Sequence, residues 1–135
     1  NGEVYNYHEI KKELIKNGIK FRSNTDTEVV LEAIEYWGVE AINKFNGMFA
    51  IALYDTKLNS FYLIRDRMGE KPLYYGWINN DFVFGSELKS IKVFNGFSGE
   101  VDRNALALYL KYDYIPAPYS IYKDIKKHIK TYKNI

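Results

Sequence analysis

The first three residues, Asn1, Gly2 and Glu3, place an amide side chain, a main-chain amide and a carboxylate on one short segment. A second carboxylate, Asp26, follows in the stretch 23–29. An amide side chain and a glycine N–H can stabilise a developing oxyanion, and two carboxylates can hold an ammonium group through charge-assisted hydrogen bonds. This set therefore predicts a site for a small zwitterion, although it contains no nucleophile.

Asp26 also has a simpler interpretation. Thr25 and Glu28 form a capping-box pattern, which puts Asp26 in the first turn of the next helix. Peptide dipoles at a helix N-terminus favour a negative charge by up to ~1 kcal/mol. The residue pattern alone leaves both interpretations open, and on its own it favours a helix-start residue slightly.

The other residues that could carry chemistry give weaker patterns. His8 and His128 are the only histidines, and neither has a second metal ligand at helical spacing, so we predict no metal site. The triplet 65–67 (Arg-Asp-Arg) could contact an anion. We favour a salt-bridge clasp that holds the adjacent loop, which contains one glycine and one proline.

Composition excludes several classes of function. The 135 residues fit one domain with a sizeable core, since 47% are apolar. A net charge of +2 gives no argument for a nucleic-acid or membrane partner. The absence of cysteine excludes disulfides and a cysteine nucleophile within these residues. Because the sequence opens without Met inside an extended stretch, we expect it to belong to a longer protein.

Two helices are expected in the first part of the chain. Asn6 and Glu9 form a capping box for the first helix, which should end at residues 17–18 (Asn-Gly). The second helix should begin after Thr25 and end at Gly38, and a short helix is expected over residues 39–45. The expected buried face of the second helix consists of Val30, Ala33, Ile34 and Trp37.

Four antiparallel strands should follow, over residues 48–55, 60–65, 73–78 and 82–84. The first two are apolar on both parities, which is typical of strands that are buried on both faces. This pattern predicts an α+β layered domain in which a sheet lies between a helical layer and a second sheet.

Beyond the strands, Ser86 should cap a helix that runs to about Phe94, and Asp102 should cap another that stops before Tyr114. The lysine-rich end, residues 121–135, is interpreted as a solvated surface segment.

Five strings resemble the class II glutamine amidotransferase domain, in order and at similar spacing. They are NGEVYNY (1–7), SNTDTEV (23–29), NGMFA (46–50), RDRMGEKPLYY (65–75) and GSELK (85–89). Glu3 and the run 71–75 are most similar to glutamine-hydrolysing asparagine synthetase, as is the stretch 102–118. Beta-lactam synthetase-like proteins remain an open alternative.

The resemblance implies an N-terminal-nucleophile hydrolase-like α/β/β/α sandwich of antiparallel sheets, incomplete at its N-terminus. Residues 1–95 would form a partial amidotransferase domain. Residues 96–135 would form its C-terminal part and the link toward an ATP-dependent synthetase domain outside this sequence. Residues 128–133 (HIKTYK) stand where relatives have a Pro-Gly turn before the last strand, so whether that strand forms is left open.

The resemblance also implies roles for the opening residues. Asn1 and Gly2 would form the oxyanion hole, and Glu3 and Asp26 would hold the α-amino group of L-glutamine. The cysteine nucleophile and the arginine that grips the substrate carboxylate would lie upstream of residue 1. The chain itself would carry no cofactor, since ATP and Mg²⁺ belong to the synthetase domain.

Two hypotheses follow. The first is the glutaminase part of a cytoplasmic asparagine synthetase, inactive by itself because the nucleophile is absent; its partners would be its own synthetase domain and, as a further candidate, a second copy in a homodimer. The second is a non-catalytic domain on the same scaffold that binds a ligand or partner.

Overall fold

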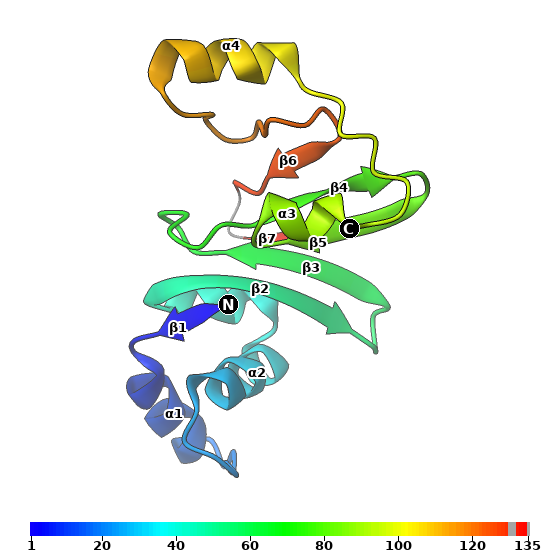
Figure 1. The fold of residues 1–135 in the computed structure, drawn as a ribbon. Helices are drawn as coiled ribbons and strands as arrows, with labels where there is room; N and C mark the ends of the chain where they lie inside the picture. Colours follow the sequence, from blue (N-terminus) through cyan, green and yellow to red (C-terminus); the bar gives the residue numbers. More distant parts are fainter. Residues whose placement is uncertain (130–131, 135) are drawn as a thin grey trace. The chain divides into compact units, whose positions relative to one another are not determined.

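The computed structural model describes residues 1–129 and 132–134, the last three by their backbone alone. The chain forms two compact units, Asn1–Phe49 and Ala50–Ile135, and strand β2 (Gly47–Asp55) runs from the first into the second (Figure 1). Each unit is described by itself.

The first unit is mainly helical. Its elements are β1 (Gly2–Val4), α1 (Tyr7–Lys16), α2 (Asp26–Trp37), the 3₁₀-helix η1 (Val39–Lys44) and the start of β2. Strand β1 pairs antiparallel with β2, with Glu3 opposite Met48. Helix α2 packs against α1, η1 and β1 (Figure 1), so it is the element that joins the others. The short helix predicted over residues 39–45 is thus confirmed as a 3₁₀-helix.

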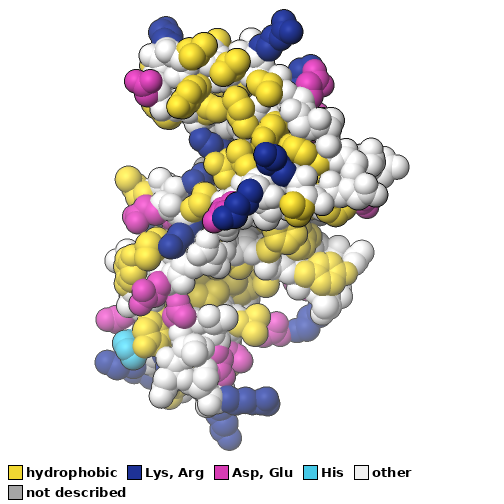
Figure 2. All heavy atoms as spheres, viewed as in Figure 1, with side chains coloured by type: hydrophobic (Ala, Val, Ile, Leu, Met, Phe, Trp, Pro, Cys, Tyr) yellow, Lys and Arg dark blue, Asp and Glu magenta, His cyan; other side chains and the backbone are white. Residues whose placement is uncertain are grey.

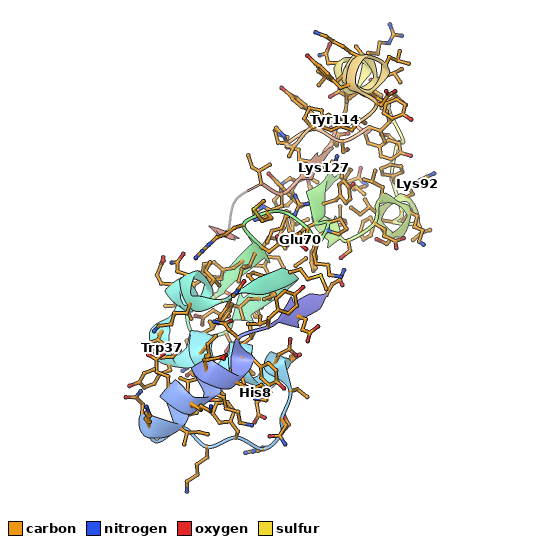
Figure 3. The ribbon with its side chains drawn as sticks, turned by 90° about the vertical axis from the view of Figure 1, so that its left-hand side faces the viewer. His8, Trp37, Glu70, Lys92, Tyr114 and Lys127 are labelled. Atoms are coloured by element: carbon orange, nitrogen blue, oxygen red, sulfur yellow. The ribbon has the colours of Figure 1, made fainter. Side chains whose placement is uncertain are left out.

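The helices bury the faces that their apolar spacing predicts, with one shift. Ile10 and Leu14 of α1 are buried. In α2 the buried residues are Ala33, as predicted, and Val29, which the prediction missed. The other three predicted residues are only partly buried. One of them is Trp37, at the end of α2 (Figure 3), which has the Lys44 Nζ over its ring at 4.5 Å.

Asn6 occupies the predicted N-cap position of α1, but the predicted capping box is wrong. Its side chain makes no cap hydrogen bond. Instead, its Nδ2 donates to the carbonyl of Lys44 at 2.9 Å and its Oδ1 accepts from the N–H of Asn46 at 2.8 Å. The side chain therefore joins the corner after β1 to the segment that leads into β2.

The strands of the second unit lie in two antiparallel sheets. Residues 50–55 of β2 pair with β3 (Ser60–Arg65), and β3 pairs with β7 (Tyr132–Asn134). The strand order β5 (Asp81–Gly85), β4 (Tyr74–Ile78), β6 (Ile125–Lys127) makes the other sheet. Helices α3 (Leu88–Lys92) and α4 (Arg103–Tyr112) complete the unit. The final strand, left open above, is present as β7.

Apolar side chains pack the two sheets of this unit face to face. One core cluster contains Leu63 of β3 with Tyr75 of β4 and Phe82 of β5. On the opposite face of the second sheet, Val83 and Ile91 belong to a cluster that includes residues of α3 and β6. The predicted α+β organisation with one sheet on another is confirmed here.

Burial on both faces, predicted for the first two long strands, holds for β3 and only partly for β2. Neighbouring residues Leu63 and Ile64 of β3 are both 0% exposed. In β2, Ala52 and Tyr54 are exposed, so one face of its second half meets solvent.

The interpretation of residues 121–135 as a solvated segment is wrong for its first part. Ile125 and His128 are 1% and 2% exposed, and β6 pairs with β4 so that Ile125 lies opposite Gly76. A Cβ at Gly76 would come within 2.0 Å of the Asp124 carbonyl, so the glycine permits this close pairing. Residues 130, 131 and 135 of the predicted segment lie outside the described residues.

The helix ends of this unit were predicted with mixed success. Asp102 caps α4, since its Oδ1 accepts from the N–H groups of Asn104 and Ala105. Ser86 does not cap α3, because Glu87 occupies that position and the helix is only five residues long.

Apolar side chains gather over α4 in Figure 2, and the exposed ones include Leu106, Tyr109 and Leu110.

Arg65 and Asp66 hold the adjacent loop, as predicted, through main-chain groups; the salt bridge predicted within residues 65–67 stays a prediction. The Arg65 guanidinium donates to the carbonyls of Lys71, Gly69 and His128 at 2.6–2.7 Å. The buried Asp66 carboxylate accepts from the N–H groups of Glu70 and Lys71. Because the planar guanidinium presents several fixed donors, Arg65 can hold its own loop and the segment after β6 together.

Arg65→Lys should therefore destabilise the fold. A lysine cannot reproduce the fork and would leave carbonyls without their charged donor, which predicts a loss of about 2–4 kcal/mol in the free energy of unfolding. Urea unfolding measures this loss. Arg67→Lys, at an exposed neighbouring position, is the matched control and should change stability by less than about 0.5 kcal/mol. Equal effects of the two substitutions would contradict the clasp.

Candidate functional site

Strand β1 carries two of the predicted site residues, and glycines on both sides make its pairing with β2 very close. Gly2 has φ +128°, and a Cβ there would lie 2.0 Å from the carbonyl oxygen of Met48. Across the pair, a Cβ on Gly47 would lie 2.1 Å from the carbonyl oxygen of Glu3. Any side chain at either position would separate the strands, so glycine is required at both.

Asp26 is the first residue of α2, as predicted, and its carboxylate contacts β1. Its Oδ2 accepts the N–H of Val4 at 3.0 Å, although the two residues are 22 positions apart. The next amide, of Tyr5, donates to the carbonyl of Asn46 on the β2 side. Since successive amides of an extended chain point to opposite sides, Asp26 lies along the side of β1 that faces away from β2.

The structure thus brings Asp26 beside the strand that carries Gly2 and Glu3. Gly2 and Glu3 are consecutive in β1, and Asp26 binds the residue that follows Glu3. Asn1 directly precedes the strand and is exposed, as are Gly2 and Glu3, whereas Asp26 is partly buried. Their catalytic and binding roles stay predictions.

The sequence interpretation missed the set of bonds that shapes the loop before Asp26. The Glu28 carboxylate accepts from the N–H of Arg22 at 2.8 Å and from the N–H and hydroxyl of Ser23 at 2.7 and 2.5 Å. The hydrogen bonds from the Ser23 hydroxyl and the Arg22 amide hold the pKa of Glu28 below its usual value of 4.5. This carboxylate is therefore ionised near neutral pH, and its hydrogen bonds hold residues 22 and 23 against the start of α2.

The predicted capping box at α2 is only half right. Thr25 is the N-cap, and its Oγ1 accepts the Glu28 N–H at 3.4 Å. The Glu28 carboxylate bonds two and three residues before the cap, and the Thr25 N–H donates to the Ser23 Oγ at 3.3 Å. The spacing identified the correct helix start and the wrong partner for Glu28, because Ser23 and Thr25 are both able to bond the turn.

The described part of the chain offers neither a metal cluster nor a membrane-spanning helix. Within residues 1–129 and 132–134, no group of three or more metal-ligating side chains comes together, and no described helix is long and apolar enough to cross a bilayer. His8, on α1 (Figure 3), packs its ring 4.0 Å from that of Tyr7.

Comparison with solved structures identifies the class of fold. The chain is similar to glutamine phosphoribosylpyrophosphate (PRPP) amidotransferase from Bacillus subtilis complexed with ADP and GMP, with a TM-score of 0.60 and 24% identity. The similarity covers 69% of this chain and 22% of that one. The fold is therefore of the N-terminal-nucleophile hydrolase type, with mixed helices and open antiparallel sheets.

Sequence comparison then gives the family. Residues 1–132 match the model of the glutamine amidotransferase domain, and the chain belongs to this family. It is 40% identical over 129 residues to a putative glutamine-hydrolysing asparagine synthetase 2 of Methanocaldococcus jannaschii, covering 94% of this chain and 24% of the relative. It is 39% identical over 127 residues to asparagine synthetase 1 of Bacillus subtilis, covering 94% and 20%. The chain thus spans a quarter or less of these relatives.

Gly2→Ala should break the pairing of β1 with β2, because the new Cβ would meet the Met48 carbonyl. Amide hydrogen exchange at Val4 and Tyr5 should speed up at least about tenfold, which corresponds to ~1.4 kcal/mol of local stability. Gly18→Ala is the control, since Gly18 also has a positive φ (+87°) but open space around it. It should leave exchange at both amides unchanged, and slow exchange in Gly2→Ala would refute the close-approach argument.

Proposed function

We propose that this chain is the glutamine-binding part of the glutaminase domain of a cytoplasmic asparagine synthetase. Membership of the glutamine amidotransferase family and 34–40% identity to glutamine-hydrolysing asparagine synthetases support the proposal. The observation that carries it is the hydrogen bond from the Val4 N–H to Asp26, which draws a distant carboxylate against the strand of Gly2 and Glu3.

In this proposal, Glu3 and Asp26 bind the α-ammonium group of L-glutamine. The Oδ2 of Asp26 is fixed by the hydrogen bond from the Val4 N–H. Its Oδ1 accepts a long hydrogen bond of 3.5 Å from the Thr27 hydroxyl. Oδ1 is therefore the oxygen that an ammonium group would engage. Hydrogen bonds between charged groups contribute roughly 1.5–3 kcal/mol each, enough to select a substrate with an α-amino group.

Asn1 and Gly2 would act on the other end of the substrate. When a nucleophile adds to the amide carbon, the carbonyl oxygen becomes an oxyanion, and the Asn1 side chain and Gly2 N–H would donate to it. The C–N bond then breaks, and the leaving nitrogen takes the proton that the base accepted from the nucleophile and departs as ammonia. Water then hydrolyses the acyl-enzyme to glutamate and the free nucleophile. The nucleophile is expected to be a cysteine outside residues 1–135, with its own α-amine as base.

The ammonia would be used by a synthetase domain outside these residues to amidate aspartate with ATP and Mg²⁺. A homodimer of the whole protein is a further part of this proposal. The division into an amidotransferase portion at residues 1–95 and a linking portion at 96–135 also remains a prediction.

The second candidate is a binding domain on the amidotransferase scaffold that performs no chemistry; the exposed Glu3 and partly buried Asp26 carboxylates would serve it equally well for holding a cationic ligand. The two proposals differ in whether the full-length protein hydrolyses glutamine.

The purified 135-residue chain should release no ammonia from L-glutamine above the buffer rate, because no residue in it can serve as the expected nucleophile. The full-length protein should release ammonia and glutamate in equal amounts. A coupled glutamate dehydrogenase assay on both proteins measures this difference. Activity in the isolated chain would refute the split site, and no activity in the full-length protein would favour the binding domain.

Two substitutions in the full-length protein should separate binding from catalysis. Asp26→Asn keeps an oxygen for the Val4 N–H and removes the charge, so KM for glutamine should rise about 10–100-fold with little change in kcat. Asn1→Ala removes an oxyanion donor and should lower kcat about 10²–10³-fold. Steady-state kinetics distinguish the two outcomes. An unchanged KM in Asp26→Asn would remove Asp26 from the ammonium site.

A further inference from the structure

The loop at residues 22–25 leads directly into Asp26, and side chains from both helices of the first unit hold it. Glu28 of α2 accepts the amides of Arg22 and Ser23 and the hydroxyl of Ser23. Lys11 of α1 donates from its Nζ to the Ser23 carbonyl at 2.7 Å and to the Asn24 Oδ1 at 2.9 Å. The Glu28 carboxylate thus binds two N–H groups of the loop, and the Lys11 ammonium binds two of its oxygens.

Lys11 has a further contact that limits its freedom. Its Nζ lies 4.9 Å from the centre of the ring of Phe21, the residue before the loop, so the ammonium contacts this ring as well as the loop. Lys11 and Glu28 are both partly buried, and their helices pack against each other. The loop therefore bridges α1 and α2 through two oppositely charged groups that act on consecutive residues.

We propose that Glu28 and Lys11 are positioning residues for Asp26 and that together they set the preference of the site for substrates with an α-ammonium group. This inference rests on the proposed function and deepens it. The Asp26 carboxylate must accept the Val4 N–H and bind the substrate ammonium at the same time. The backbone of Asp26 directly continues the loop. A shift of the loop would misplace Oδ1 while leaving the strand that carries Gly2 and Glu3 in place.

The alternative is that Glu28 only stabilises the start of α2. Because the hydrogen bonds from the Ser23 hydroxyl and the Arg22 amide favour its ionised form, the folded pKa of Glu28 is lowered; Glu28 therefore contributes to stability above pH 4.5, and the contribution is lost as the pH falls through its lower folded pKa. A purely structural role would therefore affect stability and all substrates alike. A positioning role affects only substrates that use Asp26.

The test uses the full-length protein and two substrates, L-glutamine and 4-carbamoylbutanoate, which is the same amide without the α-amino group. In Glu28→Gln, kcat/KM for glutamine should fall about tenfold, mainly through KM, since small misplacements of binding groups have effects of this size or more. The kcat/KM for 4-carbamoylbutanoate should change less than about twofold, so that discrimination between the two substrates falls.

Two further variants complete the design. Lys11→Met removes the hydrogen bonds from the α1 ammonium to the loop and leaves α2 unchanged. It should lower discrimination between the two substrates, as Glu28→Gln does. This keeps the proposal testable if Glu28→Gln fails to fold. Glu35→Gln, in the last turn of α2 and exposed, is the matched control and should leave discrimination unchanged.

The outcomes separate this inference from the proposed function. If Asp26→Asn lowers discrimination but Glu28→Gln and Lys11→Met do not, the positioning role is overturned and the function stands. Equal losses for both substrates in these two variants would also overturn it and show a purely structural role. If Asp26→Asn leaves discrimination unchanged, Asp26 does not bind the ammonium group, and the positioning role falls with that assignment; the glutaminase function falls only if the full-length protein releases no ammonia from L-glutamine.

Discussion

The first unit depends on one hydrogen bond between segments far apart in sequence, from the Val4 N–H to Asp26. A carboxylate at the start of a helix is already favoured by the peptide dipoles, and here it also satisfies an amide on the side of β1 that β2 does not use. The same contact fixes the rotation of the carboxylate. A structural requirement and the proposed chemical role therefore use different oxygens of one side chain, and they do not compete.

Charged side chains that bind main-chain groups recur through the structure. Glu28 and Asp66 each accept successive amides of a loop, and Arg65 donates to three carbonyls. Loop amides and carbonyls have no ladder partners and must be satisfied otherwise. Ionised side chains do this with stronger hydrogen bonds than neutral ones. Loops beside the strands are thereby held in defined shapes without a large apolar core of their own.

The sequence predicted the helices and the strands β2 to β5 in their order, because apolar periodicity and turn residues are local signals. The pairings of β1 with β2, of β3 with β7 and of β4 with β6 were not predicted. It placed Asp26 at the first turn of α2 through the Thr25 cap. It could not show that Asp26 reaches β1 or that Asn6 bonds residues 44 and 46, since both contacts depend on tertiary structure. Strand β6 was missed because its two lysines, Lys126 and Lys127, made the segment around Ile125 read as a charged surface.

The bond from Arg65 to the His128 carbonyl spans 63 positions, which has a consequence for the order of folding. All described bonds that position Asp26 lie within the first 28 residues. The second unit can close only when residues 125–128 arrive to pair with β4 and accept from Arg65. Contacts between distant residues form slowly, because a long loop must be closed first. During synthesis, which proceeds from the N-terminus, the loop and helix start that hold Asp26 would therefore be shaped while the sheet that follows still exposes its apolar faces.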